Sequence, residues 1–287
     1  MSRMLQGAWL ALREAMSAPT LPRVPEPLAE MADPTSVRDF HEAGGTDGPL
    51  LPVYHFNARA VHALAPRGAT VLDLGCGSGR FLAYLAGRRP DLQLIGLDLS
   101  APMVTLGNDM LRAEGISDRV ELLLGDMTAF TSALPVKPHV ISSIFSLHHL
   151  PTRAHLNACA RELGAAHRQT SAAIWIFDHA RPRREETASR FPEIFTPSAP
   201  PAFKLDSRNS LRASWSFHEM REALRTFIDP TAKSLLARFL PLYQVHWLSC
   251  RERVADEALW VAGNELTRSA KKDCVALARM FSRAPGW

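Results

Sequence analysis

The sequence predicts an α/β protein, a parallel sheet doubly wound with helices, and three observations support this. The segment V-L-D-L-G-C-G-S-G-R at residues 71–80 is typical of a strand, a tight glycine turn and the start of a helix. Further short apolar runs follow, separated by stretches with helical patterns. Several of these runs end in a polar or acidic residue, at the edge of the sheet where parallel strands present their ligand sites.

The residues before the glycine turn predict two helices. Residues 4–16 have apolar side chains at helical spacing, and the prolines that follow form a linker that cannot be helical: Pro19, Pro22, Pro25 and Pro27. The first helix either packs on the body or on a partner subunit, or acts as a lid over an active site. A glycine-rich turn at 44–49 leads to a second helix at 52–64.

The sheet itself is predicted from five apolar runs. Strands are expected at 70–74, 92–97, 120–124, 140–145 and 172–177, with helices at 81–86, from Ser100 to Gly115 and at 152–163. Ser100 is the expected N-cap of its helix, and Pro102 suits the first turn.

The remaining residues are harder to interpret. Many prolines and arginines at 179–214 predict either an insertion over the mouth of the sheet or a loose loop. A helix capped by Ser214 or Ser216 should follow. Runs at 234–240 and 243–248 predict a closing hairpin, and 253–281 is helical by pattern. We therefore expect a helix and linker at 1–48, a main domain at 49–250 and a helical extension at 251–287.

Composition limits the class of protein. A net charge of +4 is mild and spread along the chain, which favours solvated surface over a nucleic-acid stripe, with steering of an acidic substrate as the alternative. Four scattered cysteines form no C-x-x-C pair, so a reducing cytoplasm is expected. No apolar run reaches the length of about 20 residues needed to span a membrane.

The strand ends predict a nucleoside site. The turn reads G-x-G-x-G, without the longer dinucleotide fingerprint or a phosphate-binding lysine loop. Asp98 lies 23 positions after Gly75 (98 − 75), where a carboxylate can accept from both ribose hydroxyls. Asp126 can accept from an adenine amine beside that ribose. Asp73, inside an apolar strand, needs a partner, either the N–H groups of the glycine turn or the ammonium of a cofactor.

These motifs together resemble the class I S-adenosylmethionine-dependent methyltransferases. The matching blocks are V-L-D-L-G-C-G-S-G-R at 71–80, L-I-G-L-D-L-S at 94–100, G-D-M at 125–127 and S-L-H-H-L-P at 146–151. The resemblance implies a Rossmann-like sheet of seven strands with the last strand antiparallel. It implies S-adenosyl-L-methionine as cofactor and S-adenosyl-L-homocysteine as product, bound by these residues: Asp73, Gly75, Cys76, Gly77, Gly79, Asp98, Leu99, Asp126, Met127, Ser143 and Ser146.

Methyl transfer needs positioning, desolvation and sometimes a base. The base candidates above the sheet are His148, His149, Asp178, Tyr54 and His55. One histidine of the pair is expected to be structural and the other to face the pocket.

The predicted function is methylation of an O, N or S atom of a small molecule. The alternatives are a non-catalytic scaffold with the cofactor fold and a nucleic-acid methyltransferase, which the lack of a basic stripe disfavours. No metal is expected, since no cluster in the sequence has ligand spacing. A homodimer is the partner expected beside the acceptor.

Overall fold

One mixed sheet forms the centre of the molecule. The structure is a computed structural model that describes residues 3–26, 34–45, 48–132, 136–197, 199–249, 256–262 and 266–287. Seven strands lie in the order β3-β2-β1-β4-β5-β7-β6. Their bounds are β1 Thr70–Leu74, β2 Gln93–Asp98, β3 Val120–Leu124, β4 Val140–Ile144, β5 Ala173–His179, β6 Lys233–Leu236 and β7 Tyr243–Leu248.

The first five strands pair in parallel, and β7 runs antiparallel to both β5 and β6. This confirms the Rossmann-like, seven-stranded doubly wound sheet with an antiparallel last strand. The order reverses beside β1, where β4 pairs on the other side from β2. Such a switch point leaves a crevice beyond the carboxyl ends of the central strands.

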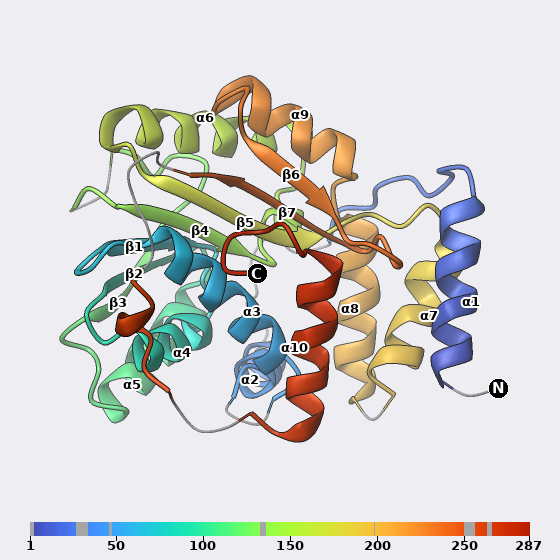
Figure 1. Cartoon of the computed structure of the whole chain (residues 1–287), viewed down its shortest axis with the longest axis horizontal. Helices are drawn as coiled ribbons and strands as arrows, with labels where there is room; N and C mark the ends of the chain where they lie inside the picture. Colours follow the sequence, from blue (N-terminus) through green and yellow to red (C-terminus); the bar gives the residue numbers. More distant parts are fainter. Residues whose placement is uncertain are drawn as a thin grey trace.

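Helices cover both faces of the sheet (Figure 1). On one face α6 (Arg153–Thr170) and α9 (Phe217–Phe227) pack over Leu72 and Ile141. The other face carries α3 (Leu51–Leu64), α4 (Arg80–Arg88), α5 (Ala101–Ala113) and α10 (Arg268–Met280), with Val71 and Val140 beneath them. Alternate residues of each strand thus supply two separate cores, as the period of two requires.

The stretch at 179–214 is an insertion with two helices, so the alternative of a loose loop is wrong. It contains α7 (Glu185–Phe195) and α8 (Pro201–Ala213), which pack against each other. Proline fits here because Pro200 and Pro201 stand at the start of α8, where no N–H bond is lost. Phe191 and Leu211 form a small third core with Leu240 and Leu242.

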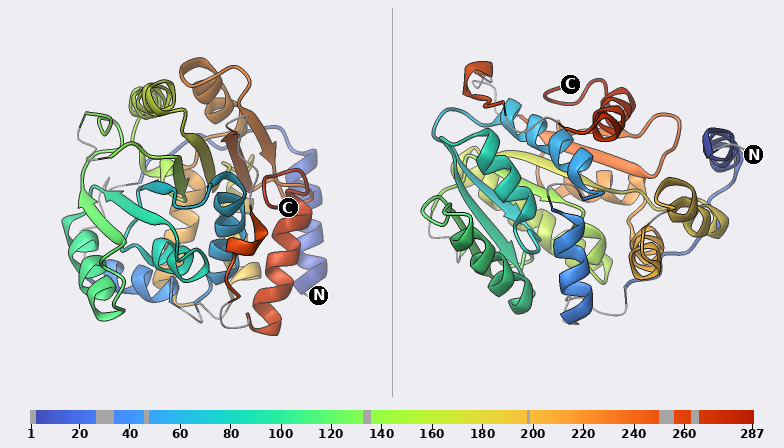
Figure 2. Two further views of the ribbon diagram at one scale, coloured as in Figure 1. Left: turned by 60° about the vertical axis from the view of Figure 1, so that its left-hand side comes forward. Right: turned by 90° about the horizontal axis from the view of Figure 1, so that it is seen from below.

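The N-terminal helix lies at the edge of the molecule. The predicted helix is α1 (Arg3–Met16), and it packs on α7 rather than over the sheet (Figures 1 and 2). Residues 17–26 are non-helical, as the prolines predicted; Pro27 lies outside the described residues. This segment returns along the insertion toward the carboxyl edge of the sheet.

Several element boundaries differ from the prediction. Helix α2 (Pro34–Ala43) was not expected, and strand β6 ends at Leu236, so it is shorter than the predicted run at 234–240. Ser216, rather than Ser214, caps α9 and does so with a capping box to Glu219. In the tail, only the short turn η2 (Glu257–Leu259) and α10 are helical among the described residues, and Cys250 lies outside them.

The last residues join the main core. Phe281 is fully buried, and the Trp287 ring stacks on Phe56 at 5.3 Å between centroids. The Trp287 indole N–H also donates to the Phe56 carbonyl at 3.1 Å. Residues 266–287 therefore pack as part of the same body as α3.

Candidate functional site

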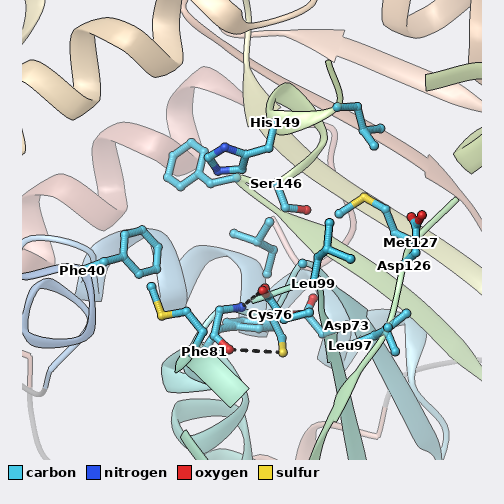
Figure 3. A pocket seen from close by; sticks show the side chains of 18 of the residues that line it. Phe40, Asp73, Cys76, Phe81, Leu97, Leu99, Asp126, Met127, Ser146 and His149 are labelled. Atoms are coloured by element: carbon cyan, nitrogen blue, oxygen red, sulfur yellow. Dashed lines mark hydrogen bonds between the residues drawn. The ribbon is translucent and has the colours of Figure 1, made fainter. Parts of the chain in front are cut away.

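A cavity of about 240 Å³ opens at the carboxyl ends of β1, β2 and β4 (Figure 3). Eleven of its 23 lining residues are site residues predicted from the sequence: Tyr54, Asp73, Gly75, Cys76, Gly77, Asp98, Leu99, Asp126, Met127, Ser146 and His149. Phe40, from the unpredicted helix α2, lies across from Met127. The predicted residues Gly79, Ser143, His148 and Asp178 do not line this cavity.

The glycine turn gives the cavity its floor. Gly75, Gly77 and Gly79 all have positive φ, at +69°, +55° and +71°. At Gly75 a side chain is excluded for two reasons. The positive φ disfavours any other residue, and a Cβ built there would lie 2.3 Å from the Cβ of Ser146. The bend therefore brings bare backbone close to whatever fills the cavity.

The N–H groups of this turn are bonded inside the protein. Those of Gly75 and Cys76 donate to the Leu97 carbonyl, and that of Gly77 donates to Asp98 Oδ2 at 2.6 Å. The expectation that Asp73 accepts from the turn is therefore wrong. The turn therefore contributes its backbone shape to the cavity, and Asp98 stabilises the turn through its hydrogen bond to Gly77.

Asp98 and Asp126 stand at neighbouring strand tips. Asp98 Oδ1 accepts from the Ser100 N–H at 2.9 Å, so each carboxylate oxygen has one protein donor and keeps a further lone pair. Burial raises the pKa of Asp98 against these hydrogen bonds. Asp126 is exposed and uses only Oδ1 locally, to accept from the N–H and hydroxyl of Thr128. Both acids line one open cavity.

Asp73 lies at the inner end of the cavity and is almost fully buried. The Ser142 hydroxyl donates to it at 2.6 Å, but burial raises the pKa of Asp73 to about 7. Its carboxyl group is therefore poised to ionise beside a cation. Tyr54, also buried, lines the same cavity, and burial raises the pKa of its phenol, which keeps it protonated.

Ser143 in β4 and Ser146 in the loop after it form one cluster. Their hydroxyl oxygens are 2.6 Å apart, and each donates to the Leu74 carbonyl or to the other serine. Ser146 reaches the cavity, while Ser143 supports it from behind. Cys76 lines the cavity as a neutral thiol, because burial, followed by Asp98 and Asp73, raises its pKa.

Comparison with known proteins agrees with this geometry. A family model described as "Methyltransferase domain" matches residues 71–168, which include β1 to β4, the glycine turn and both acids. The chain contains a class I methyltransferase domain. Among curated relatives, the release factor glutamine methyltransferase of Nitratidesulfovibrio vulgaris is 32% identical over 91 residues, which are 32% of this chain and 31% of that protein.

A carboxy-S-adenosyl-L-methionine synthase of Campylobacter jejuni is 42% identical over 53 residues, 18% of this chain and 23% of that protein. The matched regions thus span less than a third of these relatives. Among solved structures, the plantazolicin methyltransferase BpumL, in complex with a monoazolic desmethylPZN analog and SAH, aligns over 87% of this chain and 99% of that chain. Its TM-score is 0.57 at 13% identity, so this likeness shows the methyltransferase fold alone.

A second cavity of about 120 Å³ adjoins the first and lies under the insertion of the methyltransferase domain. The two cavities share Phe40, Leu50, Phe145 and His149. Rings from several elements line the second cavity, with polar groups at one end: Phe191, Phe203, Tyr243, His148, His179 and Asp206.

Among the described residues no helix is long and apolar enough to cross a membrane.

Asp178 does not face either cavity, although its position at a strand end predicted this. It is 1% exposed, and its Oδ1 accepts from the ring of His148 at 2.6 Å and from the His179 N–H at 2.7 Å. Its Oδ2 accepts from the His148 main chain at 3.0 Å. Burial lowers the pKa of His148, yet the Asp178 charge outweighs burial and raises it. Asp178 thus fixes the ring of His148 through Nδ1.

His149 faces both cavities, and its partner comes from the N-terminal segment. Its Nδ1 is 2.5 Å from Glu26 Oε2, and Glu26 Oε1 accepts from Ser210 at 2.9 Å. Burial opposes ionisation of Glu26, but His149 and its neighbours lower the pKa of this carboxyl to about 2. Glu26 is therefore an anion bonded to His149 and Ser210, behind the lining of the two cavities rather than in it.

Arg23 fixes the segment that carries Glu26. Its guanidinium donates to four main-chain carbonyls, at 2.6 to 3.0 Å, and stacks on Trp215 at 3.7 Å. Two of these carbonyls, of His148 and Leu150, belong to the loop that carries both histidines. We call residues 17–26 the strap, because they tie this loop to the insertion.

Sequence reasoning missed several residues of the site. Arg23 and Glu26 lie in the proline-rich linker, Asp206 lies on α8 and Phe40 on α2, and none of these stretches has a recognised motif. Phe145 has φ of +53° and stacks on His179, which is a strained conformation for a bulky residue at a cavity wall. For Glu26, the sequence shows no more than a glutamate between two prolines.

Proposed function

We propose that this protein transfers a methyl group from S-adenosylmethionine to an O, N or S atom of a small molecule. The observation that carries the proposal is the pair Asp98 and Asp126, which line one open cavity above the Gly75 bend. A solved structure of similar fold contains bound SAH, and the methyltransferase family model covers both acids and the glycine turn.

In this proposal the cofactor lies across the strand tips. Asp98 accepts from the ribose hydroxyls, Asp126 through its free Oδ2 accepts from the adenine amine, and Leu99 and Met127 pack on the adenine ring. Asp73 meets the ammonium, since its pKa near 7 lets a cation ionise it. Gly75, Gly77 and Gly79, with Cys76, Ser143 and Ser146, shape the methionine end.

The acceptor is assigned to the second cavity. Its ring-lined wall and volume of about 120 Å³ suit a small aromatic or apolar molecule rather than a folded macromolecule. The shared residues Phe145 and His149 bring the two ligands end to end, as in-line displacement requires. The acceptor's proton leaves at the polar end of this cavity, beside His148 and His149, whereas Asp178 and Tyr54 act on position rather than as bases.

Two further assignments belong to the proposal. We place the protein in the cytoplasm, in keeping with free buried thiols at Cys76, Cys159 and Cys274. Leu5, Leu12 and Met16 are exposed on α1, which is consistent with a homodimer.

The test is calorimetric titration with S-adenosylmethionine. Asp98→Ala should weaken binding about 100-fold or more, because it removes two charge-assisted hydrogen bonds worth roughly 1.5–3 kcal/mol each. Asp118→Ala, at an exposed acid in the turn before β3 that does not line the cavity, is the matched control and should bind as the wild type does. Failure of the wild type to bind, or full binding by Asp98→Ala, contradicts the proposal.

The acceptor class has its own test. Metabolite extracts and total RNA would each be incubated with the enzyme and methyl-labelled cofactor. Label in low-mass products supports a small-molecule acceptor. Label in RNA alone refutes that class, and no label in any pool from a protein that binds the cofactor supports a scaffold.

A further inference from the structure

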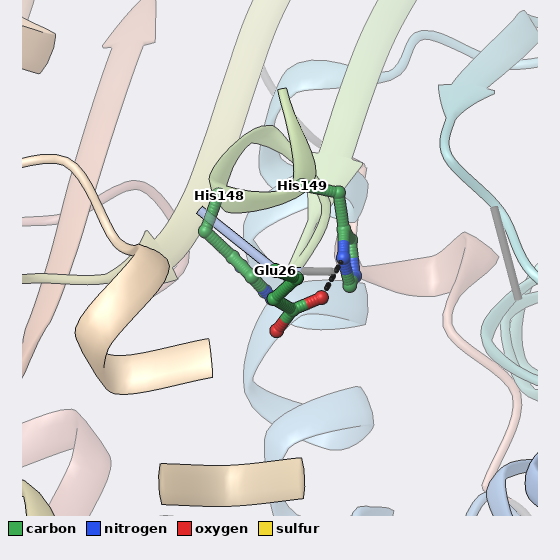
Figure 4. Close-up of side chains that lie close together, drawn as sticks. All are labelled: Glu26, His148 and His149. Atoms are coloured by element: carbon green, nitrogen blue, oxygen red, sulfur yellow. Dashed lines mark ion pairs between the residues drawn. The ribbon is translucent and has the colours of Figure 1, made fainter. Parts of the chain in front are cut away.

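The polar end of the second cavity gathers an unusual set of ligand atoms. Glu26, His148 and His149 each place one carboxylate oxygen or ring nitrogen within 4.8 Å of the other two (Figure 4). They come from two segments more than a hundred residues apart, the strap and the loop after β4. Two imidazoles with one glutamate form a set that catalytic zinc uses, with a further position left for water or substrate.

His148 has the support that metal-binding histidines require. Its Nδ1 is bonded to Asp178 Oδ1 at 2.6 Å, and its main-chain N–H is bonded to the other oxygen of the same carboxylate. This fixes the tautomer and leaves Nε2 as the ligand atom. The orientation of the ring is therefore set before any ion arrives.

The charges at this end also favour a cation. Three carboxylates, of Glu26, Asp178 and Asp206, interact with the two imidazoles. Arg23 contributes one positive charge nearby, but its guanidinium is used on main-chain carbonyls. With neutral imidazoles the cluster is left with an excess of negative charge.

The site would still be open to a ligand. His149 is exposed over about a third of its side chain and lines both cavities, and His148 lines the second cavity. An ion bound here replaces the proton between Glu26 and His149, because ligands must be deprotonated. Its free coordination position then faces the space assigned to the acceptor.

We propose that Glu26, His148 and His149 bind a divalent metal ion of zinc type at the seam between the two cavities. The role of this metal, but not its binding, rests on the proposed methyl transfer. In that role the metal selects acceptors with a hydroxyl or thiol. That group binds the metal and loses its proton to solvent. Its oxygen or sulfur then forms the bond to the methyl carbon while the carbon–sulfonium bond breaks, and the electron pair stays on sulfur as S-adenosylhomocysteine.

The experiment uses untagged full-length protein, stripped with a chelator, dialysed and titrated with Zn²⁺ alone or Co²⁺ alone. Metal content after gel filtration gives stoichiometry, and the visible absorption of Co²⁺ gives coordination. The site variants are Glu26→Gln and His149→Ala, which spare the buried His148–Asp178 pair. The controls are Glu193→Gln and His218→Ala, both exposed and away from the cavities.

Wild type and controls should hold about one Zn²⁺ per chain, and both site variants should bind it more than about tenfold more weakly. A wild type that holds no zinc, or either site variant with less than a tenfold loss, overturns the metal site. Titration of the same samples with S-adenosylmethionine separates the two proposals. Cofactor binding without zinc binding refutes only the metal site, and zinc binding without cofactor binding refutes only the proposed function.

Discussion

The two cavities of this molecule share a wall but are built differently. Most of the cofactor cavity comes from one continuous stretch, residues 73–155, and its turn is held by hydrogen bonds between adjacent strands. The second cavity draws on α2, the loop after β4, the insertion and β7, with the strap fixing its polar end. A locally encoded cofactor site should therefore survive changes in the covering segments, whereas the second cavity should depend on distant contacts.

The largest effect is expected from a substitution in the cofactor cavity, at Gly75. Gly75→Ala places a Cβ 2.3 Å from that of Ser146 at φ of +69°, so overpacking and backbone strain together should cost about 2–5 kcal/mol. Chemical denaturation and cofactor titration would measure this, and binding should fall at least about 100-fold.

Gly68→Ala is the matched control for that change. Gly68 has φ of +67°, but nothing lies within 4 Å of a Cβ built there. Its cost should be the backbone term alone, about 1–2 kcal/mol, with cofactor affinity unchanged. Equal losses for both variants would show that close packing at Gly75 does not matter.

A smaller effect should separate the two cavities. Arg23→Ala removes four hydrogen bonds and the stack on Trp215, which should free the strap and lower methyl transfer about 30-fold or more. Cofactor affinity should stay within about twofold, because Arg23 does not line that cavity. Steady-state kinetics beside calorimetry would show it.

Arg13→Ala is the control on α1, since its exposed pair with Glu186 is worth little. It should leave both readouts unchanged. Parallel loss of cofactor binding and turnover in Arg23→Ala would mean that the two regions are not independent.

The smallest effect is a pH dependence inside the cofactor cavity. The pKa of Asp73 is about 7 in the free protein, and the ammonium of the cofactor prefers the ionised form. Affinity should therefore be constant above that pKa and fall by up to about tenfold per pH unit below it. Titrations across this range would test the slope, and Asp73→Asn should abolish it. A binding affinity of the wild type that does not change with pH would show that the cofactor ammonium does not bind Asp73.

The same contrast explains what the sequence could predict. The strands from β1 to β5 and the acids at their tips follow from short apolar runs and from one glycine turn, which are local signals. Helices α7 and α8 were obscured by prolines that sit at or inside helices, and α2 gave no recognised pattern. Their formation depends on packing between segments, which a single sequence does not display.

Side-chain partners were the least predictable part. The pairing of Glu26 with His149 joins residues 123 positions apart (149 − 26), and no spacing rule reaches that far. Asp178 was expected at the cavity because strand ends point there, but the buried ring of His148 holds it inside. Local pattern predicts which residues reach an edge, and tertiary contacts decide where they face.

A crystal structure with S-adenosylhomocysteine tests the central claim most directly. We predict the nucleoside in the cavity above Gly75, with both ribose hydroxyls within about 3 Å of the Asp98 carboxylate and the adenine amine at Asp126. The methionine end should lie beside Asp73, with its sulfur directed toward His149 and the second cavity. Ligand bound elsewhere, or a nucleoside that touches neither acid, would contradict the account.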